Sequence, residues 1–208
     1  EGLDFMPILH SLNLSDNMIT KVEGLDRLVT LETIQLKRNR FGKNDDDVND
    51  LKGLLDCPSL SVLDLSDNFL QNPAILEEVI YKMPKLTVLY LQGNPFTKKV
   101  KNYRKVIIDK IPLLRYLDDR PVFKDDRRYA EAFVRGGYDE ERKEREVYKK
   151  EESDKHWANH EAFSEMIKKA KEEKRLDDLA KKEALEQAAI AEDQAKHEEE
   201  AAPLLEDS

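Results

Sequence analysis

The sequence predicts an α/β solenoid, with a parallel sheet on its concave face, helices on the convex side, a C-terminal cap and a long charged α-helical extension. Three observations predict this fold class. One leucine-containing pattern recurs through the first half of the chain, charged residues concentrate in the second half, and residues 139–201 contain neither Gly nor Pro. A solenoid needs caps at its ends, because its last core layer would otherwise meet water.

The recurring pattern places leucine or isoleucine at fixed spacings and ends on an asparagine. Its four full copies are Leu9-Leu12-Leu14-Asn17, Leu31-Ile34-Leu36-Asn39, Leu60-Leu63-Leu65-Asn68 and Leu86-Leu89-Leu91-Asn94. A fifth, incomplete copy follows at Leu114 and Leu117, and successive copies begin 22, 29, 26 and 28 residues apart. The pattern is that of a leucine-rich repeat, and four full copies are not a chance match.

Each repeat predicts one short strand, near residues 11–14, 33–36, 62–65 and 88–91. Two leucines of the strand point inward and the alternate residues point to the concave face. Helical spacing of apolar residues predicts convex helices within 48–55, 75–80 and 100–111. The repeated asparagines should form a buried ladder that satisfies backbone groups where each strand ends, namely Asn17, Asn39, Asn68 and Asn94.

Composition divides the chain into three regions: repeats over 1–96, a cap and short helix over 97–135, and a charged helical extension over 136–208. Residues 1–120 carry 17 Lys and Arg and 18 Asp and Glu, whereas residues 121–208 carry 18 and 26. The extension is too polar to bury a core. Its apolar residues follow no steady heptad, so we expect a monomer. The chain opens inside a repeat without an initial Met, and we expect further repeats before it.

Several function classes lack support in the sequence. No motif for catalysis or for a cofactor is present, so we expect no catalytic residue and no cofactor. The acidic run 44–50 lacks the Gly and Glu positions of a calcium loop and is interpreted as the solvated start of a helix. His156 and His160 lack the metalloprotease order, so no metal is expected. The acidic balance and the absence of a long apolar run argue against nucleic-acid and membrane partners.

The segment after the repeats carries a more specific resemblance. Residues 103–118 resemble the cap of the 22-residue class of leucine-rich repeats, which includes a regulatory subunit of protein phosphatase 1 and a spliceosomal protein. The expected cap residues are Tyr103, Leu114, Leu117 and Asp118. The run Leu117-Asp118-Asp119-Arg120-Pro121-Val122, a short helix over 124–135, Gly136-Gly137-Tyr138 and the charged residues that follow resemble the dynein axonemal assembly factor 1 family.

The resemblance implies a non-catalytic scaffold that binds dynein-arm subunits in the cytoplasm, before the arms enter cilia or flagella. It implies axonemal dynein subunits as partners, with chaperones as further candidates. On the concave face we expect contacts from Asn13, Gln35, Lys37, Asp64, Val88, Tyr90 and Gln92, beside Ser11, Ser15, Thr33, Val62 and Ser66. On the extension the expected anchors are Trp157, Phe163, Met166 and Ile167, since aromatic anchors dominate binding energy.

Two alternatives stay open at this point. The chain could be a structural subunit of the axoneme whose helix contacts dynein, microtubules or other axonemal proteins. From the repeat class alone, it could also be an adaptor like the phosphatase-1 regulator or the spliceosomal protein. Recovery from the cytosol, rather than from salt-extracted axonemes, would favour the assembly factor over the structural subunit.

Overall fold

A computed structural model describes residue 6 and residues 8–44 and 46–201, with side chains described as far as Ala191. The chain divides into two compact units between Tyr148 and Lys149. The first unit contains the repeats and the cap, and the second is helical as far as Ala201. Each unit is described by itself.

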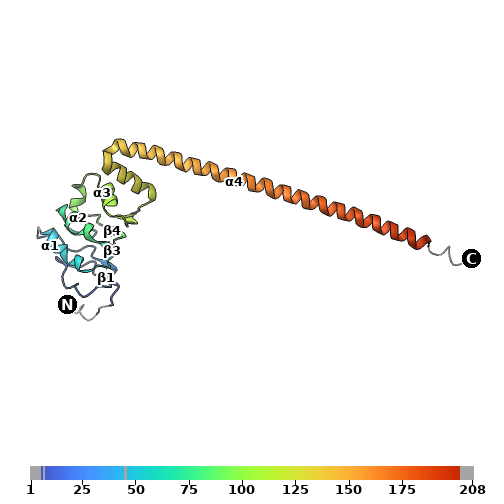
Figure 1. The fold of residues 1–208 in the computed structure, drawn as a ribbon. Helices are drawn as coiled ribbons and strands as arrows, with labels where there is room; N and C mark the ends of the chain where they lie inside the picture. The colour runs from blue at the N-terminus through green and yellow to red at the C-terminus, as the bar shows by residue number, and fades with distance from the viewer. Residues whose placement is uncertain (1–5, 7, 45, 202–208) are drawn as a thin grey trace, which may run out of the picture. The chain divides into compact units, whose positions relative to one another are not determined.

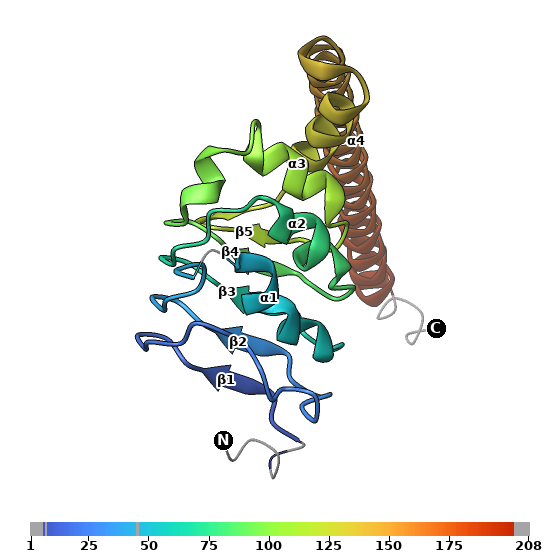
Figure 2. The ribbon, with the colours of Figure 1, turned by 90° about the vertical axis from the view of Figure 1, so that its left-hand side faces the viewer.

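The first unit is built on one six-stranded sheet in which the strands follow chain order. The strands are β1 (Ser11–Asn13), β2 (Thr33–Gln35), β3 (Val62–Asp64), β4 (Val88–Tyr90), β5 (Tyr116–Leu117) and β6 (Arg120–Pro121). β1 to β5 pair in parallel, and β6 returns antiparallel to β5. Figure 2 shows the strands stacked, with α1, α2 and α3 on one side. The solenoid fold that the repeats predict is confirmed.

The register of the sheet aligns equivalent repeat positions in rows across the strands. One row contains the central strand residues Leu12, Ile34, Leu63, Leu89 and Leu117. Apart from Leu12, which is half-buried, all of them are buried in the core. Because side chains alternate along a strand, the two flanking rows point away from the core. These flanking rows form the concave face.

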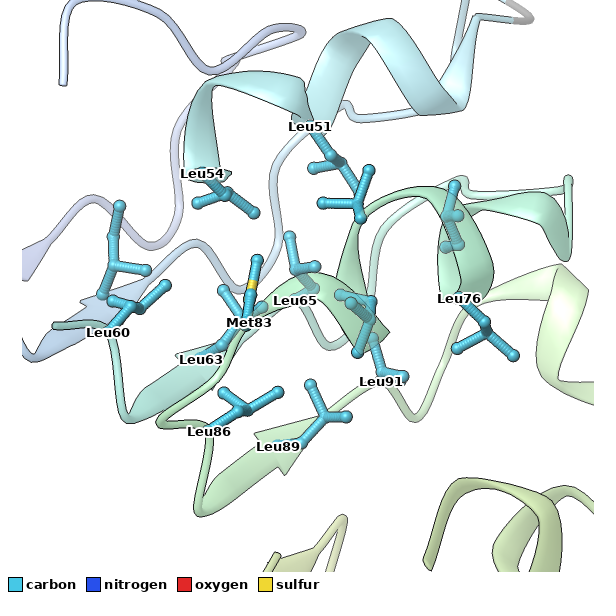
Figure 3. Packing of buried hydrophobic residues seen from close by; sticks show 14 of the residues in the cluster. Leu51, Leu54, Leu60, Leu63, Leu65, Leu76, Met83, Leu86, Leu89 and Leu91 are labelled. Atoms are coloured by element: carbon cyan, nitrogen blue, oxygen red, sulfur yellow. The ribbon is translucent and has the colours of Figure 1, made fainter. Parts of the chain in front are cut away.

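Short helical segments cover the inward side of the sheet. They are α1 (Asp47–Leu51), α2 (Ala74–Glu78), α3 (Tyr103–Lys110), and the 3-10 turns η2 (Lys52–Asp56), η3 (Ile80–Lys82) and η4 (Pro95–Lys98). Figure 3 shows Leu51, Leu54 and Leu76 from this layer packed against the strand leucines. The helix expected over 100–111 begins only at Tyr103, because η4 precedes it and Asn102 is left-handed, with φ of 52°.

Three of the four asparagines form the expected buried ladder, namely Asn39, Asn68 and Asn94. The side-chain amide of Asn68 donates to the carbonyls of Leu36, Leu65 and Ser66, and its oxygen accepts from the N–H of Asn39 at 3.1 Å. Each ladder side chain therefore ties its own repeat to the one before it.

Asn17 does not share this burial, contrary to the expectation. Its amide donates to the carbonyls of Leu14 and Ser15, within its own repeat, and the side chain is exposed. The physical reason is its place in the first described repeat, where no earlier strand among residues 8–44 supplies a second layer of carbonyls.

The residue before each ladder asparagine has a left-handed backbone. Asp16, Arg38, Asp67 and Gly93 have φ values of 60°, 52°, 56° and 79°. Asp and Gly tolerate this region, whereas Arg38 is the exception among the four, because arginine rarely adopts a left-handed backbone. At Gly93 the restriction is also steric, because a Cβ there would overlap the carboxylate of Asp67.

The acidic run does start a helix, α1, but two of its carboxylates are not solvated, which corrects the expectation. Asp47 and Asp50 are buried. The Asp47 carboxylate accepts backbone N–H bonds from Gln71 and from Asn72, the latter at 2.6 Å, and Asp50 accepts one from Gly42 at 3.0 Å. Burial raises the pKa of Asp50, although the Gly42 bond opposes the shift. These carboxylates accept hydrogen bonds from backbone N–H groups in loops of neighbouring repeats. Residue 45 lies outside the described residues.

After β6 the chain continues as α4 (Lys124–Ala201), which is interrupted at Gly136 and Gly137. Gly137 has φ 70° and ψ −157°, a region that is essentially restricted to glycine. The chain reverses direction there, between the short helix 124–135 and the long helix that begins at 138 (Figure 1). The Gly-Gly pair thus ends the short helix and separates it from the long one.

The first turns of the long helix belong to the repeat unit, so the second unit begins at 149 rather than at 136. Glu141 is buried between Lys105 and Arg145, and Lys105 also lies 4.6 Å from the ring centroid of Phe133. Burial would raise the pKa of Glu141, but hydrogen bonds from the two cations outweigh burial and lower it. Ion pairs and edge-to-face ring contacts, of Tyr138 with Phe133 and of Tyr148 with Tyr129, thus fix residues 138–148 to the cap.

Deleting residues 150–208 should therefore leave the melting midpoint of the repeat unit nearly unchanged. The removed residues lie almost wholly in the separate helical unit, and the cap contacts of residues 138–148 remain. Thermal unfolding followed by tyrosine fluorescence of both lengths measures this directly. A large fall in the midpoint would mean that the extension contributes to the stability of the repeats.

Candidate partner-binding site

The concave face of β1 to β4 carries the seven residues expected to contact a partner. Asn13, Gln35 and Gln92 are exposed. The other four, which are Lys37, Asp64, Val88 and Tyr90, are half-buried. Parallel pairing puts Asn13, Gln35, Asp64 and Tyr90 in one row. The structure therefore brings these residues onto one continuous surface.

Ser66 does not belong to this surface, which corrects its assignment. The side chain is buried, and its hydroxyl lies 2.6 Å from Oδ1 of Asp64. The backbone N–H of Ser66 donates to the same oxygen at 2.9 Å. Both bonds hold the Asp64 carboxylate in a fixed position on the face.

Tyr116 extends the face toward the cap and was missed as a contact residue from the sequence. It pairs with Val88 in the sheet, and its ring centroid lies 5.9 Å from that of Tyr90, with the ring planes tilted by 50°. Its position in the incomplete fifth repeat, one residue before Leu117, matches Val88 before Leu89. That register was the signal available in the sequence.

The face is polar at one end and apolar at the other. Across the sheet, one outward row runs Ser11, Thr33, Val62, Val88, Tyr116. In the row beside it, Asn13 and Gln35 on β1 and β2 are followed by Asp64 and Tyr90 on β3 and β4. The large apolar surfaces are therefore gathered over β3, β4 and β5, next to the cap.

Cations on this face are paired with carboxylates of neighbouring turns. Lys37 Nζ lies 3.5 Å from Asp67, and Arg38 makes a two-nitrogen contact with Asp16, with Nη2 at 2.9 Å from Oδ2. The Arg38 guanidinium lowers the pKa of Asp16 through its hydrogen bond and charge. Both pairs are largely solvated, so each contributes little to stability.

The environment of Tyr90 changes the pKa of its phenol. Its partial burial raises the pKa of the phenol, and the nearby Tyr116 and the Asp64 charge raise it further. The phenol therefore stays neutral at physiological pH. An amphipathic ring held between a second ring and a carboxylate suits binding, since tyrosine supplies contact area and a polar group together.

The cap residues lie where the resemblance places them, over the last repeat. Leu114 and Leu117 are buried, and Tyr103 is half-buried against the core. Burial and the Asp118 carboxylate raise the pKa of Tyr103. Oδ1 of Asp118 accepts the backbone N–H groups of Leu91 and Gln92 at 2.8 Å and 3.0 Å, which closes the last strand of the repeats.

The proposed anchors of the extension are all exposed, from 38% for Ile167 through 57% for Phe163 and 59% for Met166 to 67% for Trp157. Phe163, Met166 and Ile167 follow i, i+3, i+4 spacing and share one helix face. Trp157 precedes Phe163 by six residues, which is about 120° around the helix. The structure brings three of the anchors together and separates Trp157, whose ring instead lies 6.0 Å from His160.

Among the side chains that the structure describes, which end at Ala191, no group of three or more from His, Cys, Asp or Glu is placed to hold a metal ion. Over the same described residues, no helix is both long and apolar enough to cross a membrane. Part of the basic run near 98–105 is occupied by structural contacts. Arg104 donates to the carbonyls of Leu117 and Pro121, and Lys105 pairs with Glu141.

Comparison with known proteins places the fold in a family and identifies close sequence relatives. The family profile described as leucine-rich repeat matches residues 6–147. The Chlamydomonas reinhardtii "Leucine-rich repeat-containing protein ODA7" is 44% identical over 113 residues, which are 54% of this chain and 26% of that protein. The human and mouse proteins called "Dynein axonemal assembly factor 1" are 44% and 45% identical over 126 and 129 residues.

The matches cover 61% and 62% of this chain but 17% and 20% of the human and mouse proteins, so the chain spans about a sixth to a quarter of such relatives. Among solved structures, a chain of the Drosophila melanogaster SNF/U2A′ complex matches with a TM-score of 0.52 and 28% identity, over 70% of this chain and 77% of that one. The resemblance to dynein axonemal assembly factors is therefore confirmed at the level of sequence relatives.

Proposed function

Because the chain belongs to the leucine-rich repeat family, we propose that it is a non-catalytic scaffold of dynein-arm assembly that binds axonemal dynein subunits through its concave face. The relatives named as dynein axonemal assembly factors support the role. In this proposal the protein acts in the cytoplasm, where arm subunits are joined before they enter the cilium or flagellum. Chaperones are further candidate partners.

The observation that most directly supports this binding surface is the cluster of aromatic and aliphatic side chains over β3 to β5. Val62, Val88, Tyr90 and Tyr116 project from neighbouring strands on the face opposite the core. None of them is fully buried, so the cluster can contact a partner. Binding energy concentrates on such aromatic groups at the centre of an interface, and a polar rim surrounds them.

The extension is proposed as a second, weaker surface. Its Phe163, Met166 and Ile167 form one exposed patch on a helix that is otherwise rich in charge. An exposed apolar stripe of this kind can pack into a groove of a partner. Trp157 points elsewhere around the helix, so it is proposed as a separate contact.

Replacing Tyr90 with alanine should weaken capture of dynein subunits by about fivefold or more, because interface tyrosines commonly contribute over 1 kcal/mol. The full-length native protein, tagged and expressed in ciliated cells, is captured from the cytoplasm, and dynein chains are quantified by mass spectrometry. Phe123→Ala is the matched control, because it also removes an aromatic ring, but one that is exposed and follows β6. Lys37→Glu on the concave face should also reduce capture through charge reversal.

Equal capture by the wild type and Tyr90→Ala, with both proteins folded, would contradict the proposed surface. Enrichment of microtubule or axonemal proteins without dynein subunits would instead support the structural-subunit alternative. Enrichment of spliceosomal or phosphatase-1 components would support the adaptor alternative. Far-ultraviolet circular dichroism and melting midpoints show whether each variant remains folded.

A further inference from the structure

The carboxylate of Asp64 lies beside the tyrosine pair with part of its binding capacity unused. Its Oδ1 accepts two hydrogen bonds from Ser66, one from the backbone and one from the hydroxyl. Within the described part of the chain, no donor is bonded to its Oδ2 and no cation pairs with it. The two cations of the preceding repeat, Lys37 and Arg38, are paired with Asp67 and Asp16.

The position of Asp64 relative to the rings follows from the sheet register. Asp64 and Tyr90 are direct partners in the pairing of β3 with β4, so their side chains leave the same face about 5 Å apart. The ring of Tyr116 completes the cluster from the next strand, with its centroid 5.9 Å from that of Tyr90. One carboxylate and two π faces therefore converge on a single patch.

This combination has a defined chemical preference. Aromatic faces attract cations, and a carboxylate with a free oxygen accepts N–H donors from them. A guanidinium satisfies both groups at once, because it is planar, stacks on rings and donates along its edge, whereas an ammonium is more strongly hydrated. A related arrangement with a single ring already occurs within this protein, where the Arg145 guanidinium carbon lies 4.1 Å from the ring centroid of Tyr129 while Arg145 donates to Glu141.

We propose that Tyr90, Tyr116 and Asp64 form a receptor for an arginine side chain of the bound partner. The guanidinium stacks on the two tyrosine rings and donates to Oδ2 of Asp64. The neighbouring Val62 and Val88 cover the aliphatic part of that arginine. The inference rests on the proposed function, and it adds the chemical class of the partner group that the concave face recognises.

The direct test uses a small probe and the full chain. N-acetylarginine methylamide is titrated while the ring resonances of Tyr90 and Tyr116 are followed by nuclear magnetic resonance. N-acetylcitrulline methylamide is the matched probe, because it has nearly the same shape and no charge. We expect saturable shifts of both rings with the arginine probe and affinity at least about fivefold weaker for citrulline, since the cationic and charge-assisted contacts are lost.

Asp64→Asn is the discriminating variant. Its amide oxygen can still accept the two Ser66 bonds, so the fold should persist, while the negative charge is removed. We expect the arginine probe to bind this variant at least about fivefold more weakly. Asp56→Asn, an exposed change in η2 outside the sheet, should leave binding unchanged. Absent ring shifts, equal binding of the two probes, or unchanged binding in Asp64→Asn would each overturn the inference.

Failure of this inference can be told apart from failure of the proposed function by repeating the dynein capture with Asp64→Asn. If Tyr90→Ala loses dynein subunits while Asp64→Asn retains them and the probes show no charge preference, the concave face binds dynein without an arginine receptor. If neither variant affects capture, the dynein-binding proposal fails, while the probe titration still decides whether the cluster binds a guanidinium.

Discussion

Replacing Leu117 with alanine should lower the free energy of unfolding of the repeat unit by about 2–5 kcal/mol, because it leaves a cavity in a close-packed layer. Leu117 is only 1% exposed and pairs with Leu89 in the last parallel strand. The cap above it includes Leu114 and Ile107, which are also buried. Chemical denaturation of both proteins measures the difference.

Leu113→Ala is the matched control for this change, since it removes the same atoms from a nearby leucine that is 54% exposed. The control should lie within about 0.5 kcal/mol of the wild type, as most surface substitutions do. Equal effects of the two substitutions would show that Leu117 does not close the core. The cap interpretation would then be wrong.

Replacing Asn68 with alanine should cost about 1–3 kcal/mol, because it leaves buried backbone groups without partners. The side-chain amide that is lost donates to the carbonyls of Leu36, Leu65 and Ser66, and the side-chain oxygen that is lost accepts from the N–H of Asn39. A denaturant titration of the purified repeat unit with its cap, residues 1–148, provides the measurement.

Asn17→Ala provides the matched comparison for the ladder. It is the same substitution at the same repeat position, but Asn17 is exposed and bonds only carbonyls of its own repeat. Water can replace those bonds, so the loss should be clearly smaller than at Asn68. If Asn68→Ala changed stability no more than Asn17→Ala, the ladder would not hold the repeats together.

The sheet could be predicted from the sequence because the spacing of the repeats determines where each strand lies and which of its residues face the core. Leu63 and Leu89 recur at the same place in their repeats, and period-two alternation then assigns every neighbour to a face. The position of the asparagine ladder could be predicted in the same way, but the exposure of Asn17 could not. Its environment depends on what lies beside the first strand, which a repeat pattern cannot specify.

The contacts that fix the helix start to the cap could not be read from spacing. Glu141 stands in a charged run that looks uniformly solvated, yet it is buried because Lys105 from a distant segment reaches it. Asp47 and Asp50 are a similar case, since their N–H donors lie outside the acidic run, in Asn72 far along the chain and in Gly42 eight residues earlier. A run of charged residues in the sequence shows only its composition. Whether one of these charges is buried depends on the partners that the fold brings to it from other segments.

The candidate site was only partly accessible from the sequence. Tyr90 could be assigned to the concave face from its own repeat. Tyr116 was not assigned, because the fifth repeat is incomplete, although its place before Leu117 matches that of Val88 before Leu89, and its pairing with β4 confirms the strand. The side chain of Ser66 also lies in an outward row by alternation, but its hydroxyl turns to Asp64 and is buried.

The most direct test of the account is a flagellated cell in which the full-length native protein carries Tyr90→Ala. The account predicts fewer dynein arms on the axoneme, unassembled dynein heavy chains in the cytoplasm, and a variant that is as abundant as the wild type and remains cytosolic. Electron microscopy of axonemes and quantification of cytoplasmic heavy chains measure both effects. Normal arm numbers, together with a variant that fails to occupy the axoneme, would contradict the assembly role and support a structural subunit.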